Sequence, residues 1–211
     1  MLNADLFIAF LLATTALILL PGPIVTLVIA NSISHGTRTG LSTVAGSSVG
    51  NAILVAAGAL GLSTILALLA DLFEVLRWAG VAYLVWLGLR AWREALRRGA
   101  NPEDAAMAPA TPRGRNVFAQ GVVVAVTNPK TIFFYVAFFP QFLDPALAAG
   151  PQLAVMSVAM VAIAITFDSL YAILAGQVRP WLVGRTRTRI RHGITGTLLI
   201  GTGVGLALAR R

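Results

Sequence analysis

Long apolar segments separated by short polar stretches dominate this sequence, and they constrain the fold more than any other feature. They cover residues 6–30, 41–70, 72–92, 117–143, 152–177 and 193–209. A helix needs about 20 apolar residues to cross the hydrocarbon core of a bilayer. A helix also satisfies its own backbone hydrogen bonds, which a spanning segment must do. The sequence therefore predicts an all-α membrane protein with six transmembrane helices.

The composition excludes several classes of protein. Hydrophobic residues make up 57% of the 211 residues and charged residues only 11%, whereas soluble domains carry about 25% charge. The net charge of +8 does not indicate nucleic-acid binding, because the arginines cluster beside apolar segments. The chain has no cysteine, and His35 and His192 fall in connecting segments without a second ligand nearby. No metal or other cofactor is predicted.

A polar stretch rich in proline and alanine, residues 93–116, has the composition of a linker. It separates a first unit of three helices, residues 1–92, from a second unit of three, residues 117–211. Because three is an odd number, the second unit has to enter the membrane inverted. The predicted fold is two inverted three-helix repeats joined by a cytoplasmic linker.

The arginines predict the orientation of the chain. Those on one side are Arg38, Arg90, Arg93, Arg97, Arg98, Arg113, Arg115, Arg179, Arg185, Arg187, Arg189 and Arg191. Those on the other side are Arg77, Arg210 and Arg211. The positive-inside rule places the larger group in the cytoplasm. We expect a multi-pass protein of the bacterial cytoplasmic membrane with both termini outside.

The first helix of each unit contains a proline break. Pro21, Gly22 and Pro23 interrupt one apolar segment, and Asn128 with Pro129 interrupts the other. Proline ends a helix and frees carbonyl groups, while the N-terminus of the next half-helix suits a carboxylate. One break alone is typical of a simple kink. Two breaks in corresponding positions indicate a substrate site of a transporter.

Lys130 and Asp168 are the two charged residues that we place inside the helix bundle. Ionisable residues within a membrane indicate function, and here they would bind ligand charges or exchange protons. The alternative is a structural ion pair between them. Asn51 and Asn128 place amides within apolar segments. Both are candidate substrate ligands, although for Asn51 tying helices together is the slightly preferred interpretation.

Glycines spaced four residues apart predict close helix packing. Gly46 and Gly50 begin the second apolar segment, and Gly201 and Gly205 repeat this spacing in the sixth. Small residues at this interval allow two helices to approach closely. Packing within one bundle is our preferred interpretation, with contacts of a homodimer as the alternative.

Taken together, these motifs resemble the LysE/RhtB amino-acid exporters of bacterial inner membranes over nearly the whole chain. The similarity includes Pro21–Pro23, a series of glycines from Gly36 to Gly58, and the block Asn128-Pro129-Lys130 followed by Phe139-Pro140-Gln141-Phe142. Asp168 lies where members often carry an acidic residue. Ile24 departs from the family pattern, in which asparagine often follows Pro-Gly-Pro.

The resemblance implies export of an amino acid or a related small amphoteric metabolite, by proton exchange. Lys130 would attract the carboxylate, and Asp168 would exchange a proton or pair with the amino group. A passive channel and a membrane scaffold without transport are the alternatives. An intramembrane enzyme is not predicted, because the segments contain one deep acid, no deep histidine and no cysteine.

Overall fold

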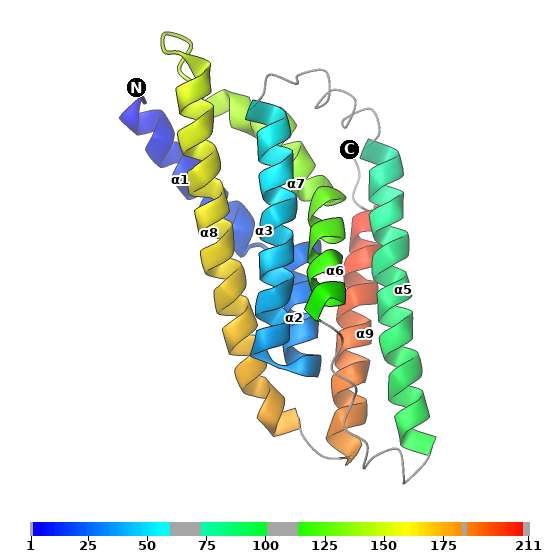
Figure 1. The fold of residues 1–211 in the computed structure, drawn as a ribbon. Coiled ribbons are helices and arrows are strands. Elements are labelled where there is room, and N and C mark those ends of the chain that lie inside the picture. Colours follow the sequence, from blue (N-terminus) through cyan, green and yellow to red (C-terminus); the bar gives the residue numbers. More distant parts are fainter. Residues whose placement is uncertain (1, 60–72, 101–113, 183–184, 209–211) are drawn as a thin grey trace.

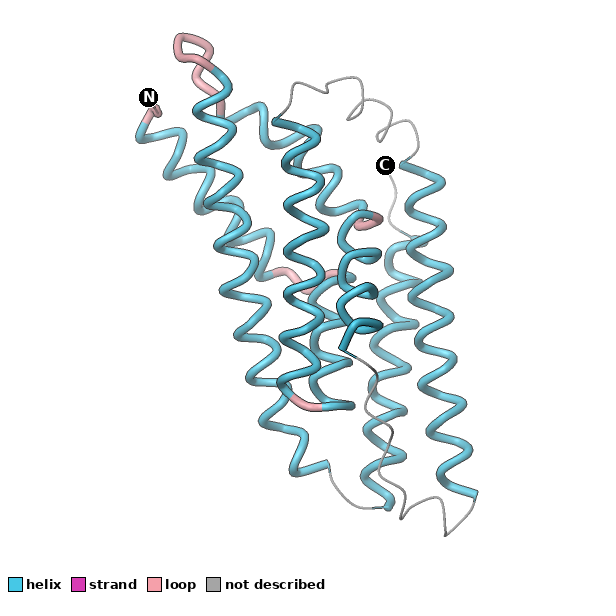
Figure 2. The backbone as a smooth tube through the Cα atoms, viewed as in Figure 1, coloured by secondary structure: helices cyan, strands magenta, loops and turns pink. Residues whose placement is uncertain are grey.

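The protein is described from a computed structural model that covers residues 2–59, 73–100, 114–182 and 185–208 (Figure 1). In these ranges every regular element is a helix, and the connections between them are short (Figure 2). The all-α prediction is therefore confirmed for the described residues. Much of the expected linker, residues 101–113, lies outside them.

The first apolar segment is broken as predicted. Helix α1 spans Ala4–Leu19 and helix α2 spans Pro23–His35, with a bend of 49° between them. Pro23 occupies the start of α2, where its missing N–H group costs no hydrogen bond. Gly36 ends α2 with a φ of 96°, a conformation that glycine adopts without strain. Helix α3, Thr37–Ala59, then runs back along the bundle.

Helix α5 covers Phe73–Ala100 and extends past the predicted end of the third apolar segment.

The fourth apolar segment is not one helix. It contains α6, which covers Gly114–Val126, and α7, which covers Pro129–Phe133. A π-helical turn, η2 (Phe134–Phe138), and a 3-10 turn, η3 (Phe139–Phe142), complete the segment. Pro129 causes the predicted break, and the irregular turns beyond it were not predicted.

The last part of the chain forms α8, Ala149–Val178, a 3-10 turn η4, Arg179–Leu182, and α9, Arg185–Leu208. By length and composition, α3 and α8 can each cross a membrane, and the bent pair of α1 and α2 can form a third span. His192 lies within α9 and is buried, so its predicted position in a connecting segment was wrong.

Glycines let the helices approach closely. A Cβ atom on Gly46 would overlap the carbonyl group of Phe118, and one on Gly50 would meet Ala125, so α3 lies directly against α6. The packing prediction is confirmed for this glycine pair. For Gly201 and Gly205 it stays a prediction, because an added Cβ there would meet no described atom within 4 Å. A homodimer stays a prediction.

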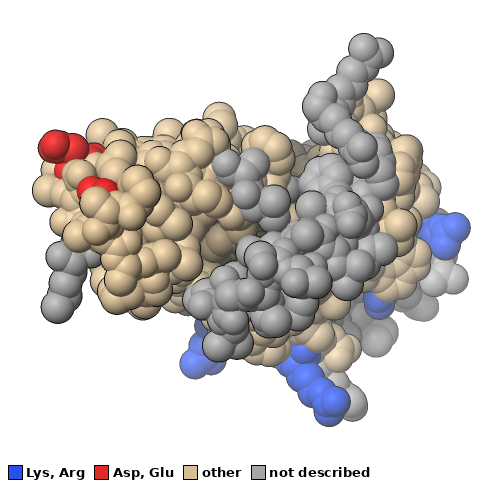
Figure 3. All heavy atoms as spheres, turned by 90° about the horizontal axis from the view of Figure 1, so that it is seen from above, with Lys and Arg blue, Asp and Glu red and all other residues tan. Residues whose placement is uncertain are grey.

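The two ends of the bundle differ. The start of α1 and the start of α8 lie at the upper end in Figure 1, whereas the turn at Gly36 and the end of α8 lie at the lower end. Seen from above, the visible acidic side chains gather at one edge of the upper end (Figure 3). Asn3 there donates a hydrogen bond of 3.0 Å to Asp144, which joins α1 to the loop before α8.

Candidate functional site

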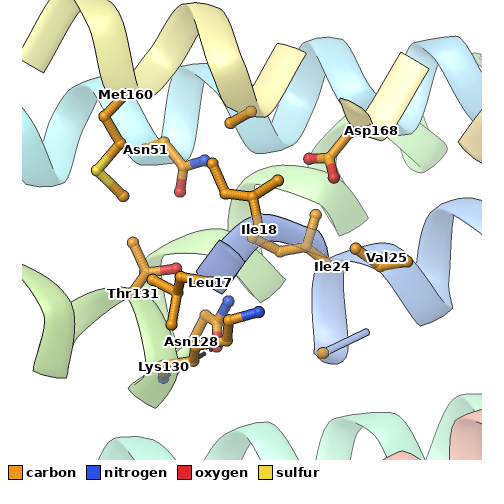
Figure 4. Close-up of a pocket in the computed structure, with 12 residues that line it drawn as sticks. Leu17, Ile18, Ile24, Val25, Asn51, Asn128, Lys130, Thr131, Met160 and Asp168 are labelled. Carbon is orange, nitrogen blue, oxygen red and sulfur yellow. Dashed lines mark hydrogen bonds between the residues drawn. The ribbon is translucent and has the colours of Figure 1, made fainter. Parts of the chain in front are cut away.

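The two helix breaks meet at a small cavity inside the bundle. Its volume is about 40 Å³, which is room for about three water molecules. Its polar lining comes from Gly22, Asn51, Asn128, Lys130, Thr131 and Asp168. Leucine, isoleucine, valine, methionine and alanine side chains complete the wall (Figure 4). The cavity thus combines an apolar lining with a few convergent polar groups, as is typical of ligand sites.

The N-terminus of α2 opens onto this cavity. Gly22 is the N-cap residue, and no side chain caps the helix there. Ile24 and Val25, in the first turn, line the cavity. The first N–H groups of a helix have no partner within the helix and carry partial positive charge. This end of α2 is suited to binding an anion such as a carboxylate.

The corresponding end of α7 is already capped. The Asn128 side chain accepts a hydrogen bond of 3.1 Å from the backbone N–H of Lys130. Asparagine is among the preferred N-cap residues for this reason. The two breaks are therefore alike in sequence position but different in chemistry, because the uncapped donors lie at α2.

The carbonyl groups freed by the first break are held by side chains from the second half of the chain. The Lys130 ammonium group donates to the carbonyl of Leu20 at 2.6 Å. The Tyr171 hydroxyl donates to the carbonyl of Leu19 at 3.0 Å. In an unbroken helix, the N–H group of residue 23 would bind the Leu19 carbonyl, but Pro23 has none.

Asp168 lies on α8 across the cavity from Lys130 (Figure 4), and only 4% of its surface is exposed. The Lys130 ammonium group is directed to Leu20, so its observed partner is a backbone carbonyl. The cavity consequently presents a cation on one wall and a carboxyl group on another. Such an arrangement can receive both charges of an amphoteric molecule.

Asn51 projects from α3 into the same space, near Met160 (Figure 4). It is 4% exposed, and its Oδ1 atom has no hydrogen-bond partner. A buried acceptor without a donor costs about 1–3 kcal/mol. This orphaned oxygen favours a role in ligand binding over the alternative of tying helices together.

An aromatic cluster lies beside the cavity. The Phe10 ring lies 5.1 Å from that of Phe139 and 5.6 Å from that of Phe142, both edge-on. The same cluster includes Phe134 and Met160, and Met160 also lines the cavity. The irregular turns η2 and η3 therefore contribute to an apolar core next to the cavity.

Most of the predicted site residues come together here. Gly22, Asn51, Asn128, Lys130 and Asp168 line the cavity, while Pro21, Pro23 and Pro129 shape the breaks beside it. Two contributors were missed. Thr131 follows the predicted lysine directly, and Tyr171 lies three residues after Asp168, on the same face of α8. Among the described residues, no group of three His, Cys, Asp or Glu could hold a metal ion.

Comparison with known proteins agrees with this picture. The chain is 35% identical to the homoserine/homoserine lactone efflux protein of Salmonella typhimurium, over 96% of each chain. It is 31% identical to the leucine efflux protein of Klebsiella pneumoniae, over 92% of this chain and 89% of the relative. It is 30% identical to an uncharacterized membrane protein of Vibrio cholerae, over 99% and 100% respectively.

No solved structure matches the chain. The family model of the LysE type translocators matches residues 15–210. This match covers nearly the whole chain, and it includes both helix breaks and every residue that lines the cavity. The chain therefore belongs to the LysE type translocator family, and it is a membrane transporter rather than an enzyme.

Proposed function

We propose that the protein exports an amino acid, or a related small amphoteric metabolite, across the bacterial cytoplasmic membrane in exchange for protons. The observation that carries this proposal is the cavity where an uncapped helix N-terminus, Lys130 and the buried Asp168 converge. The relatives named as efflux proteins for homoserine and for leucine support an amino acid as the substrate.

We propose that the substrate carboxylate binds between the N-terminus of α2 and Lys130. The N–H groups of Ile24 and Val25 and the ammonium group would all donate to it. The Oδ1 atom of Asn51 accepts a hydrogen bond from the substrate at the far side of the cavity. Asp168 pairs with the amino group or, after the substrate leaves, takes up a proton.

The arrangement of helices supports six spans in two inverted repeats, over residues 1–92 and 117–211 with the linker 93–116 between them. The last helices of the two repeats, α5 and α9, pack against each other. The second helix of each repeat packs on the broken helix of the other, α3 on α6 and α8 on both α1 and α2. This reciprocal exchange is what a two-fold axis in the membrane plane produces.

Both termini are proposed to lie outside. The turn at Gly36, the start of α6 and the end of α8 share the lower end in Figure 1, and the predicted cytoplasmic arginines flank these segments.

A cavity with room for about three water molecules is too small for an amino acid such as leucine. Substrate binding therefore requires the walls to separate, as in alternating access.

Substrate counterflow in proteoliposomes tests this function. Liposomes loaded with one amino acid at a time should take up the same labelled amino acid in a saturable manner. Asp168→Asn should abolish transport driven by a pH gradient while the protein still enters the membrane. Flux that follows the gradient without saturation would indicate a channel, and no flux for any amino acid would leave the scaffold alternative. Normal proton-driven flux in Asp168→Asn would refute the role of Asp168.

A further inference from the structure

The Leu20 carbonyl, freed at the first helix break, accepts a hydrogen bond from the Lys130 ammonium group at 2.6 Å. Resting on that function, we infer that the substrate inserts between these two groups. The carboxylate binds the Lys130 ammonium group, and the substrate ammonium group donates to the freed Leu20 carbonyl. Of the two roles proposed for Asp168, proton exchange is then the one that remains. The recognised unit is then the zwitterion itself, an ammonium and a carboxylate on neighbouring atoms.

The exchange leaves no group unpaired. Before binding, the Lys130 ammonium group donates to the Leu20 carbonyl. After binding, the ammonium group pairs with the substrate carboxylate and the carbonyl pairs with the substrate ammonium, and both new contacts are charge-assisted hydrogen bonds. A molecule with an ammonium but no carboxylate would displace Lys130 without offering it an anion. A molecule with a carboxylate but no ammonium would leave the Leu20 carbonyl without a donor, which is costly at membrane depth.

Tyr171 is a positioning residue for this exchange. Its hydroxyl holds the neighbouring carbonyl, that of Leu19, at 3.0 Å. Two adjacent carbonyls at one break would otherwise compete for the same cation. With the Leu19 carbonyl occupied by Tyr171, only that of Leu20 is open to Lys130 and then to the substrate. Tyr171 also fixes the break relative to Asp168, which lies one turn earlier on α8.

The first test uses the wild-type protein in proteoliposomes, with competitors of counterflow. The competitors are the amino acid that is exchanged, its ester, which keeps the ammonium, and the matching hydroxy acid, which keeps the carboxylate. For homoserine, the lactone is the internal ester. We expect each derivative to compete at least about tenfold more weakly than the amino acid, from the difference between charged and neutral hydrogen bonds.

An ester or hydroxy acid that competes within about twofold of the amino acid would overturn the inference while leaving the transporter intact. Absence of exchange for every amino acid would instead overturn the proposed function. The two failures are therefore distinguishable.

The second test compares Tyr171→Phe with Tyr135→Phe. The Tyr135 hydroxyl is buried and has no hydrogen-bond partner, so the control removes the same atom without breaking a contact. We expect Tyr171→Phe to raise the half-saturation constant about fivefold and to leave the maximal rate within about twofold of that of the control. The difference in competing strength between the amino acid and its ester should also become smaller. A half-saturation constant equal to that of Tyr135→Phe would refute the positioning role.

Discussion

Gly22 is the tightest point of the proposed carboxylate site, which makes Gly22→Ala an informative perturbation. A Cβ atom there would lie 3.3 Å from Cδ and 3.6 Å from Nζ of Lys130. The backbone of Gly22 has φ −130° and ψ −169°, an extended conformation that alanine also adopts. The variant should therefore fold, and its added methyl group should act on the lysine alone.

The expected magnitudes follow from these distances. A carbon contact of 3.3 Å is only slightly shorter than an ordinary one, and the lysine chain can rotate away at a cost of about 0.5–1.5 kcal/mol. The ammonium group then moves away from the proposed carboxylate position, so its hydrogen bond to the bound substrate weakens. Losing half of a charge-assisted bond worth about 1.5–3 kcal/mol weakens binding by about three- to tenfold.

The assay is initial-rate counterflow in proteoliposomes, paired with thermal unfolding of the purified protein in detergent. Gly150→Ala is the matched control, because an added Cβ there would meet no described atom within 4 Å. Gly22→Ala should raise the half-saturation constant and leave the unfolding temperature close to that of the control. A wild-type half-saturation constant would refute the placement of the carboxylate beside Gly22 and Lys130.

Three further predictions concern stability and binding. Gly46→Ala should destabilise the protein by about 1–3 kcal/mol through overpacking against α6, whereas Gly205→Ala, which has open space, should not; equal unfolding temperatures would contradict this. Asn51→Leu should leave stability unchanged or raise it by about 1 kcal/mol, because its Oδ1 atom has no partner, while counterflow falls at least about tenfold. A large loss of stability would show that the amide ties helices together. Hydrogen bonds from Asn3 and from the backbone of Ala146 hold the pKa of the Asp144 carboxyl below its usual value. Such a group stabilises the fold above its unfolded pKa and loses this effect as the pH falls through its folded pKa. Asn3 is also the N-cap of α1, a role that does not depend on pH. Asn3→Ala should thus lower the unfolding temperature more at about pH 7 than at about pH 2, and the same loss at both values would contradict this assignment.

The positions of the helix breaks could be predicted from the sequence because proline acts locally. Pro23 and Pro129 lack an N–H group, so each ends one helix and begins another wherever the chain goes. The location of Lys130 and Asp168 inside the bundle was predictable for a different reason. Ionisable residues within an apolar segment avoid lipid, and both of these line the cavity.

The partners of these groups were not predictable. A direct ion pair between Lys130 and Asp168 was the alternative to a functional role, but the ammonium group binds the Leu20 carbonyl. Every residue has a backbone carbonyl, so the residue types do not indicate which carbonyl a side chain will bind. Which donor reaches a freed carbonyl depends on how distant helices pack. Tyr171 was missed for this reason, since 152 residues separate it from the carbonyl that it binds.

The difference between the two breaks gives the site a direction. The N-termini of two half-helices, α2 and α7, lie beside the cavity, and two equal anion sites would bind a carboxylate in either orientation. Asn128 removes that ambiguity, because its side chain occupies the first donor of α7 while Gly22 leaves the donors of α2 free. Lys130 extends from the capped half-helix toward the uncapped one and adds its charge there. In the proposed mode of binding, the carboxylate then has one position, and the rest of the substrate extends toward Asn51 and Asp168, where an acceptor without a partner and a buried carboxyl group both lie.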